Sequence, residues 1–152
     1  MVYTTLIPTL FGLGCLLVTT LAWASGSHVN QKIALVLLFA WCATMIVSAL
    51  GLARENLMLP SIDAIAAIVV AQIGGKRFPP IAVVVFGLYA VVGLVHVLAR
   101  VLAMQETYTY FATLGYLFLA QLLTVGALSG RLAIHRWSAA GRERLRLDLA
   151  RW

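Results

Sequence analysis

Three ionisable side chains interrupt long apolar stretches of the sequence, namely Asp63, His96 and Arg100. An ionisable group inside a membrane span costs at least about 2.5 kcal/mol on insertion scales, so each is a candidate functional residue. A buried Asp63 carboxylate would bind a cation or a proton, or pair with a basic residue. Asp63 also follows Pro60 and Ser61, and a proline with an acid in the first turn is typical of an ordinary helix start.

His96 and Arg100 are spaced i, i+4 and therefore share one face of a helix. Arg100 can extend to the lipid headgroups, whereas the deeper His96 needs a partner, for which Thr113 or Tyr116 lies at a suitable depth. His96 is interpreted first as a packing residue, with a proton relay to Asp63 or a haem, pigment or metal ligand as alternatives. Because no second His or Cys stands at ligand spacing, we expect no cofactor and no metal.

The composition places these residues in a membrane protein. Of the 152 residues, 62% are apolar and 11% are charged, whereas soluble domains have about 45–50% and about 25%. The apolar residues form separate blocks, which predicts an all-α, polytopic transmembrane helical bundle over residues 1–130. Four blocks reach the roughly 20 residues that cross a bilayer: 5–24, 33–53, 81–104 and 108–129.

Segment 57–73 is shorter than these four blocks, so we expect it to be interfacial or re-entrant. The bundle then has four spans and both termini in the cytoplasm. If the segment crosses, there are five spans and the N-terminus lies outside. The positive-inside rule does not decide, because the two arrangements differ only in whether Lys32 or Arg54 is cytoplasmic.

Residues 131–152 hold six of the eleven basic residues, which predicts a cytoplasmic tail and a multi-pass protein of the inner cell membrane. The spacing of Leu145, Leu149 and Trp152 predicts a short basic amphipathic helix, separated from the last span by Gly141. We expect it to lie on the anionic inner leaflet, with docking on a cytoplasmic protein as the alternative; nucleic acid is not an expected partner. The expected membrane-surface residues are Arg142, Arg144, Arg146, Arg151 and Trp152.

Two features of the last span concern helix packing. Gly126 and Gly130 form a GxxxG motif, which favours close packing within the bundle over self-association between copies. Gln121 and Thr124 are expected to form hydrogen bonds between helices.

No catalytic motif occurs in the sequence, so we do not expect an enzyme. The first functional hypothesis is a protein that acts by assembly, as a homo-oligomer or with other membrane subunits. Its short spans, small loops and charged tail resemble those of holins. The second is a small ion or proton transporter or channel that uses Asp63, His96 and Arg100, and the third is an electron-transfer or pigment subunit that uses His96.

Overall fold

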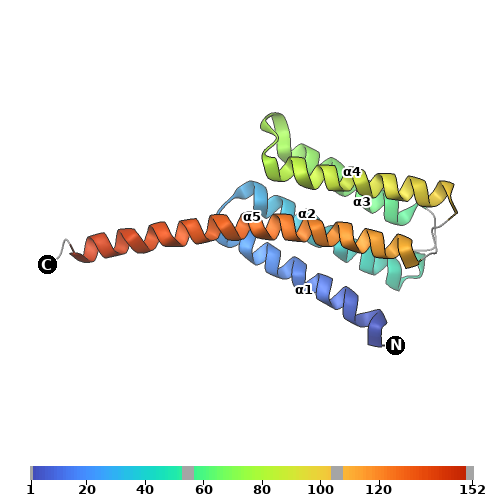
Figure 1. Cartoon of the computed structure of the whole chain (residues 1–152), viewed down its shortest axis with the longest axis horizontal. Coiled ribbons are helices and arrows are strands. Elements are labelled where there is room, and N and C mark those ends of the chain that lie inside the picture. The colour runs from blue at the N-terminus through green and yellow to red at the C-terminus, as the bar shows by residue number, and fades with distance from the viewer. Residues whose placement is uncertain (1, 53–56, 104–107, 150–152) are drawn as a thin grey trace.

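The computed structural model describes residues 2–52, 57–103 and 108–149, and these residues form an all-helical bundle (Figure 1). Its helices are α1 (Val2–Ser25), α2 (His28–Ala49), α3 (Met58–Gly74), the short 3-10 turn η2 (Gly75–Arg77), α4 (Pro80–Val101) and α5 (Tyr108–Leu149). Helices α1, α2, α4 and α5 each contain a stretch long and apolar enough to cross a membrane. The prediction of an all-α bundle with four helices able to span a membrane is therefore confirmed.

The turn between α1 and α2 shows how local sequence sets a helix boundary. Gly26 ends α1 with a positive φ of 69°, a backbone conformation that glycine adopts without steric cost. A Cβ atom at this position would also overlap the guanidinium group of Arg136 on α5. Ser27 then caps α2, because its hydroxyl oxygen accepts a hydrogen bond from the backbone N–H of Asn30.

Helix α3 lies lengthwise in the bundle between α2 and α4 and packs against both (Figure 1). Successive helices reverse direction, so α3 begins at the same end of the bundle as α1 and α5 and finishes at the end from which the C-terminal tail leaves. Its 17 residues extend about 26 Å at 1.5 Å per residue. That length is close to the lower limit for a bilayer crossing.

The surface of the bundle carries many large apolar side chains, which a soluble protein would bury. Large apolar side chains such as Leu17, Phe39 and Val97 are more than half exposed, whereas the polar side chains of Asn30 and Gln121 are buried. Such a surface fits hydrocarbon as the surrounding solvent, because lipid tails are as apolar as the side chains that face them.

The half of the bundle next to the tail contains most of the fully buried side chains. Its fully buried side chains are mostly β-branched or small, and they come from all five helices. At the same end, the Asn30 side-chain Nδ2 donates a hydrogen bond of 3.0 Å to Ser129 Oγ, joining α2 to α5. The apolar members of this half are Ala22, Ile33, Leu37, Val70, Ala82, Val85 and Val125.

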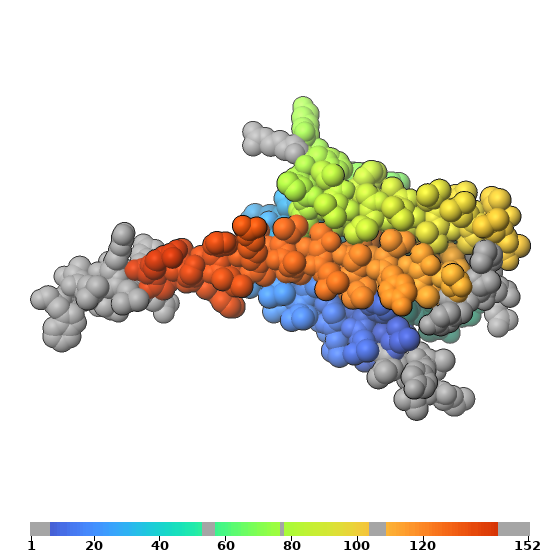
Figure 2. Space-filling view, viewed as in Figure 1, coloured from blue at the N-terminus to red at the C-terminus, as the bar shows by residue number. Residues whose placement is uncertain are grey.

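Helix α5 continues without a break through Gly141 and leaves the bundle as a straight extension (Figures 1 and 2). The prediction that Gly141 separates a short tail helix from the last span is therefore wrong. A glycine inside a helix costs only about 0.5–1 kcal/mol relative to alanine, and its neighbours Ala140 and Arg142 are strong helix formers. Arg142 is exposed.

The rest of the predicted membrane-surface set stays a prediction. The side chains of Arg144 and Arg146, like those of Leu145 and Leu149, are not among those described, and Arg151 and Trp152 lie outside the described residues.

The two glycines of the GxxxG motif have different surroundings. A Cβ atom on Gly126 would lie 3.3 Å from Val18 Cγ2 on α1, so this glycine allows α1 and α5 to approach closely. A Cβ atom on Gly130 would meet nothing within 4 Å. Of these two glycines, Gly126 contributes to the α1–α5 contact and Gly130 does not. Self-association through Gly130 stays a prediction.

We predict that Gly126→Leu destabilises the bundle by about 1–3 kcal/mol, because the added side chain must displace Val18 in a packed interface. Gly130→Leu is the matched control and should leave stability unchanged. Thermal unfolding of the two purified variants in mild detergent measures the difference. Equal losses in both would contradict a role for Gly126 in α1–α5 packing.

Candidate functional site

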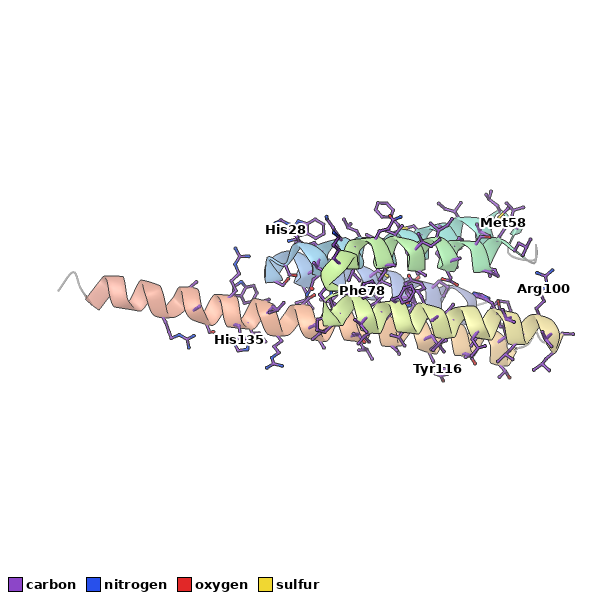
Figure 3. The ribbon with its side chains drawn as sticks, turned by 90° about the horizontal axis from the view of Figure 1, so that it is seen from above. His28, Met58, Phe78, Arg100, Tyr116 and His135 are labelled. Atoms are coloured by element: carbon purple, nitrogen blue, oxygen red, sulfur yellow. The ribbon has the colours of Figure 1, made fainter. Side chains whose placement is uncertain are left out.

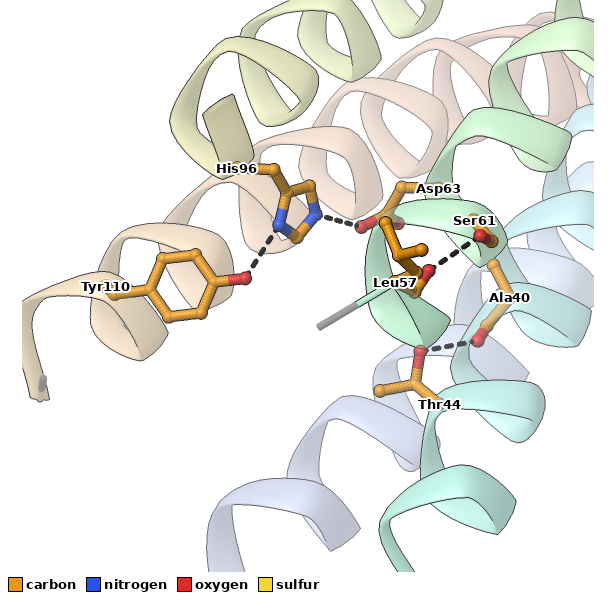
Figure 4. Close-up of polar contacts among 7 residues, drawn as sticks. All are labelled: Ala40, Thr44, Leu57, Ser61, Asp63, His96 and Tyr110. Atoms are coloured by element: carbon orange, nitrogen blue, oxygen red, sulfur yellow. Dashed lines mark hydrogen bonds and ion pairs between the residues drawn. The ribbon is translucent and has the colours of Figure 1, made fainter. Parts of the chain in front are cut away.

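Asp63, His96 and Tyr110 form one hydrogen-bonded chain across three helices (Figure 4). His96 Nε2 lies 2.9 Å from Asp63 Oδ2 on α3, and His96 Nδ1 lies 2.7 Å from the Tyr110 hydroxyl oxygen on α5. The Asp63 and His96 side chains are thus an ion pair whenever the imidazole is protonated.

The antiparallel order of the helices brings these residues to one level. Asp63 lies near the start of α3, His96 near the end of α4 and Tyr110 near the start of α5, so all three occupy the end of the bundle remote from the tail. His96 also belongs to the buried face of α4, which recurs at helical spacing. The other buried residues of that face are Val85, Tyr89, Val92 and Ala99.

The hydrogen-bond geometry accommodates two protonation states without moving heavy atoms. With a neutral imidazole, His96 Nε2–H donates to the Asp63 carboxylate and the Tyr110 hydroxyl donates to Nδ1. With an added proton, the imidazolium donates from both nitrogens, to Asp63 and to the Tyr110 oxygen. The His96 side chain is only 6% exposed, whereas that of Asp63 is 28% exposed. Tyr110 is 9% exposed, so Asp63 is the most exposed member of the chain.

A cavity of about 340 Å³ lies beside Asp63, in the same half of the bundle, and all five helices contribute to its wall. Of the described residues that line it, Asp63 alone has an ionisable side chain. Much of the remaining wall is aromatic, and the rings of Phe11 and Phe118 meet edge to face at a centroid distance of 5.5 Å. Trp41 and Phe111 complete the aromatic part of the wall.

Two buried donors on this wall, Trp41 Nε1 and Gln121 Nε2, have no hydrogen-bond partner among the described residues. Gln121 is 1% exposed. Buried polar atoms without a partner are rare and cost about 1–3 kcal/mol each. Among the described residues, Gln121 and Thr124 therefore do not form the hydrogen bonds between helices that the sequence predicts. The Thr124 hydroxyl donates instead to the Ala120 carbonyl oxygen of its own helix.

The structure joins two of the three predicted site residues and leaves out the third. Arg100 lies exposed in the last turn of α4, at the end of the helix (Figure 3). His96 pairs with Tyr110 rather than with Thr113 or Tyr116, so that prediction is wrong. The Thr113 hydroxyl donates to the Thr109 carbonyl oxygen, and Tyr116 is 72% exposed.

The tyrosine side chain is long enough for Tyr110 to reach His96 from a position one turn away from the mirror position. Thr113 is the residue of α5 that mirrors His96 across the α4–α5 connection. Tyr110 lies one turn earlier, and its phenol spans the extra distance, so counting aromatic residues one turn on either side of the mirror position would have found it.

Metal or haem ligation by His96 would require one of its two hydrogen bonds to break, because both ring nitrogens are engaged. In the described parts of the chain, no group of three His, Cys, Asp or Glu side chains is placed to hold a metal ion. The geometry therefore gives the cofactor hypothesis no support.

Fold and site together define a helical bundle with four helices able to span a membrane and an Asp–His–Tyr hydrogen-bond chain whose Asp63 lines a cavity between the helices. The chain matches no protein-family model, no curated protein and no solved structure. Its function must be argued from the geometry of the site.

We predict that Tyr110→Phe lowers the stability of the bundle by about 1–3 kcal/mol, because it leaves the buried His96 Nδ1 without its donor. Tyr116→Phe removes an exposed hydroxyl and is the matched control. Unfolding of both variants in the same detergent measures the effect. A Tyr110→Phe protein as stable as the control would show that the His96–Tyr110 hydrogen bond contributes nothing.

Proposed function

We propose that this protein is a small membrane transporter that binds and releases protons at Asp63, His96 and Tyr110. One observation carries the proposal: the hydrogen-bonded chain of these residues borders a cavity inside the bundle. Chains of Asp, Glu and His within membrane spans are the usual proton relays of pumps and transporters.

The uneven packing of the bundle supports transport by alternating access. The cavity lies in the half remote from the tail, whereas most of the fully buried side chains lie in the half next to the tail. Transport would require that half to open, with loss of the Asn30–Ser129 hydrogen bond, while the cavity closes. Rocking of helices around a central site is the common mechanism of secondary transporters.

The negative charge of Asp63 would make a proton and a cationic solute alternative ligands of one site. With a neutral His96, the site carries one negative charge in an apolar environment, which favours occupation by a proton or a cation. The titratable groups around Asp63 on the helices packed against it are Tyr89 and His96 of α4 and Tyr110 of α5. The α1 and α2 residues on the cavity wall are not ionisable. A proton and a cationic solute would thus compete for the same carboxylate.

We also propose that α3 crosses the membrane, giving five spans, an external N-terminus and a cytoplasmic tail in the inner cell membrane. The lengthwise position of α3, antiparallel to α2 and α4, supports this arrangement over the expected four spans. It places Lys32 and Lys76 on the cytoplasmic side with the arginine-rich tail. The positive-inside rule is neutral between this arrangement and four spans, because Arg54 then lies outside in place of Lys32.

Cysteine labelling tests this topology. With Cys15 and Cys42 replaced by alanine, an impermeant maleimide added to intact cells should label Leu50→Cys, in the external α2–α3 connection. The same reagent should label His28→Cys, at the cytoplasmic α1–α2 turn, only after lysis. The reverse pattern would establish four spans and overturn the five-span proposal.

Proteoliposomes loaded with a pH-sensitive dye test the transport proposal. Under an imposed pH gradient and membrane potential, we expect the wild-type protein to move protons faster than empty liposomes do. Asp63→Asn should reduce the rate to that of empty liposomes, because the amide side chain, unlike a carboxylate, neither binds nor releases a proton in the ordinary pH range. Arg100→Gln should retain the wild-type rate, because Arg100 lies outside the hydrogen-bonded chain.

The outcomes are distinct. A wild-type rate equal to that of empty liposomes at every pH would overturn proton transport. Loss of flux in Arg100→Gln as well as Asp63→Asn would instead restore the three-residue path expected from the sequence. Assembly with other copies or other membrane subunits stays a prediction, and the oligomeric state in mild detergent tests it.

A further inference from the structure

We infer that the cavity beside Asp63 binds a compact organic monocation that carries an apolar body and a hydrogen-bond acceptor. The inference deepens the proposed function, because it names the solute class for the same site. It depends on the cavity and its wall, and binding can be measured without transport.

The charge of the ligand follows from the wall of the cavity. Asp63 is the single ionisable side chain among the described lining residues, and its carboxylate is the exposed end of the hydrogen-bonded chain. In the neutral tautomer His96 contributes a hydrogen bond but no positive charge. An anionic ligand would face an uncompensated carboxylate, and a neutral one would leave that charge unpaired. A monocation balances it.

The organic nature of the ligand follows from the aromatic part of the wall. Phe11, Trp41, Phe111 and Phe118 present aromatic rings to a space that an ammonium group would share with Asp63. Rings attract ammonium cations through their quadrupoles, with an energy of about 0.5–2 kcal/mol each. Inorganic cations such as Ca²⁺ need six or more oxygen ligands, and among the described side chains of this wall only Thr44, Ser48, Asp63 and Gln121 carry oxygen atoms.

The acceptor on the ligand follows from the two unpartnered donors. Trp41 and Gln121 line the cavity, and their buried Nε1 and Nε2 donors have no partner among the described residues, so a small rotation of either side chain would let a hydroxyl, ether or carbonyl oxygen of the ligand accept a hydrogen bond from it. The cavity volume of about 340 Å³ is within the usual range for small-molecule sites. The Asp63 charge therefore selects the cation, the aromatic wall selects the apolar body, and the two donors select the acceptor of one ligand.

Calorimetric titration of the full-length protein in lipid nanodiscs tests the inference. The probe is benzyldimethyl(2-hydroxyethyl)ammonium, which combines a permanent cation, an aromatic body and a hydroxyl acceptor. Its control is the uncharged alcohol in which a carbon atom replaces the ammonium nitrogen. We expect saturable binding of the cation and at least tenfold weaker binding of the alcohol.

Three variants assign the binding to the cavity. Asp63→Asn should weaken binding of the cation at least tenfold and bring it close to that of the alcohol. Gln121→Leu should weaken both probes several-fold, because it removes a donor and keeps the charge. Thr20→Val changes an exposed side chain of α1 whose hydroxyl bonds its own helix, and it should bind like the wild type.

Each result decides the inference. Equal affinity for cation and alcohol, no binding of either, or unchanged affinity in Asp63→Asn overturns it. If Asp63→Asn does not fold, the comparison of the two probes on the wild-type protein still decides. Binding of the cation without proton flux would support this site and overturn transport, whereas flux without binding would overturn only the ligand class.

Discussion

The hydrogen bond between His96 and Asp63 is the constraint on which the rest of this bundle depends. Neither side chain can be buried among lipid-facing helices without a partner, because an unpaired ionisable group in an apolar environment costs several kcal/mol. Their pairing joins α3 to α4, and the Tyr110 hydroxyl extends the connection to α5. A short apolar helix that packs mainly through small side chains is thereby fixed in register against its neighbours.

The contrast between the two halves of the bundle follows from side-chain size. Towards the tail, small residues such as Ala22, Ala34 and Ala82 are fully buried and let the helices approach closely. Towards the other end, Phe11, Trp41 and Phe118 stand between the helices, and rings cannot interdigitate as tightly as small side chains. The cavity therefore follows from the sequence, and Asp63, the most exposed member of the hydrogen-bonded chain, lies on its wall.

Local patterns in the sequence predicted the apolar helices and identified Asp63 and His96, because an ionisable residue in an apolar stretch is visible without any structure. The partner of His96 was not predictable in this way, since it depends on the register of two helices and on the reach of the Tyr110 side chain. The cavity was also hidden, because it arises from five helices at once. The break predicted at Gly141 does not occur, because the strong helix formers around a single glycine outweigh its low helix propensity.

The shortness of α3, which on the sequence argued against a membrane crossing, has another explanation in the structure. Because α3 begins only at Met58, Asp63 lies within the first two turns of the helix, close to the end of the bundle where its carboxylate remains partly exposed. If more residues preceded Asp63 in a helix that began at the same level, the carboxylate would lie deeper in the bundle, away from His96 near the end of α4 and from the cavity. The length of α3 and the position of its acid thus satisfy one requirement: a carboxylate that is held by a buried histidine yet accessible from the cavity.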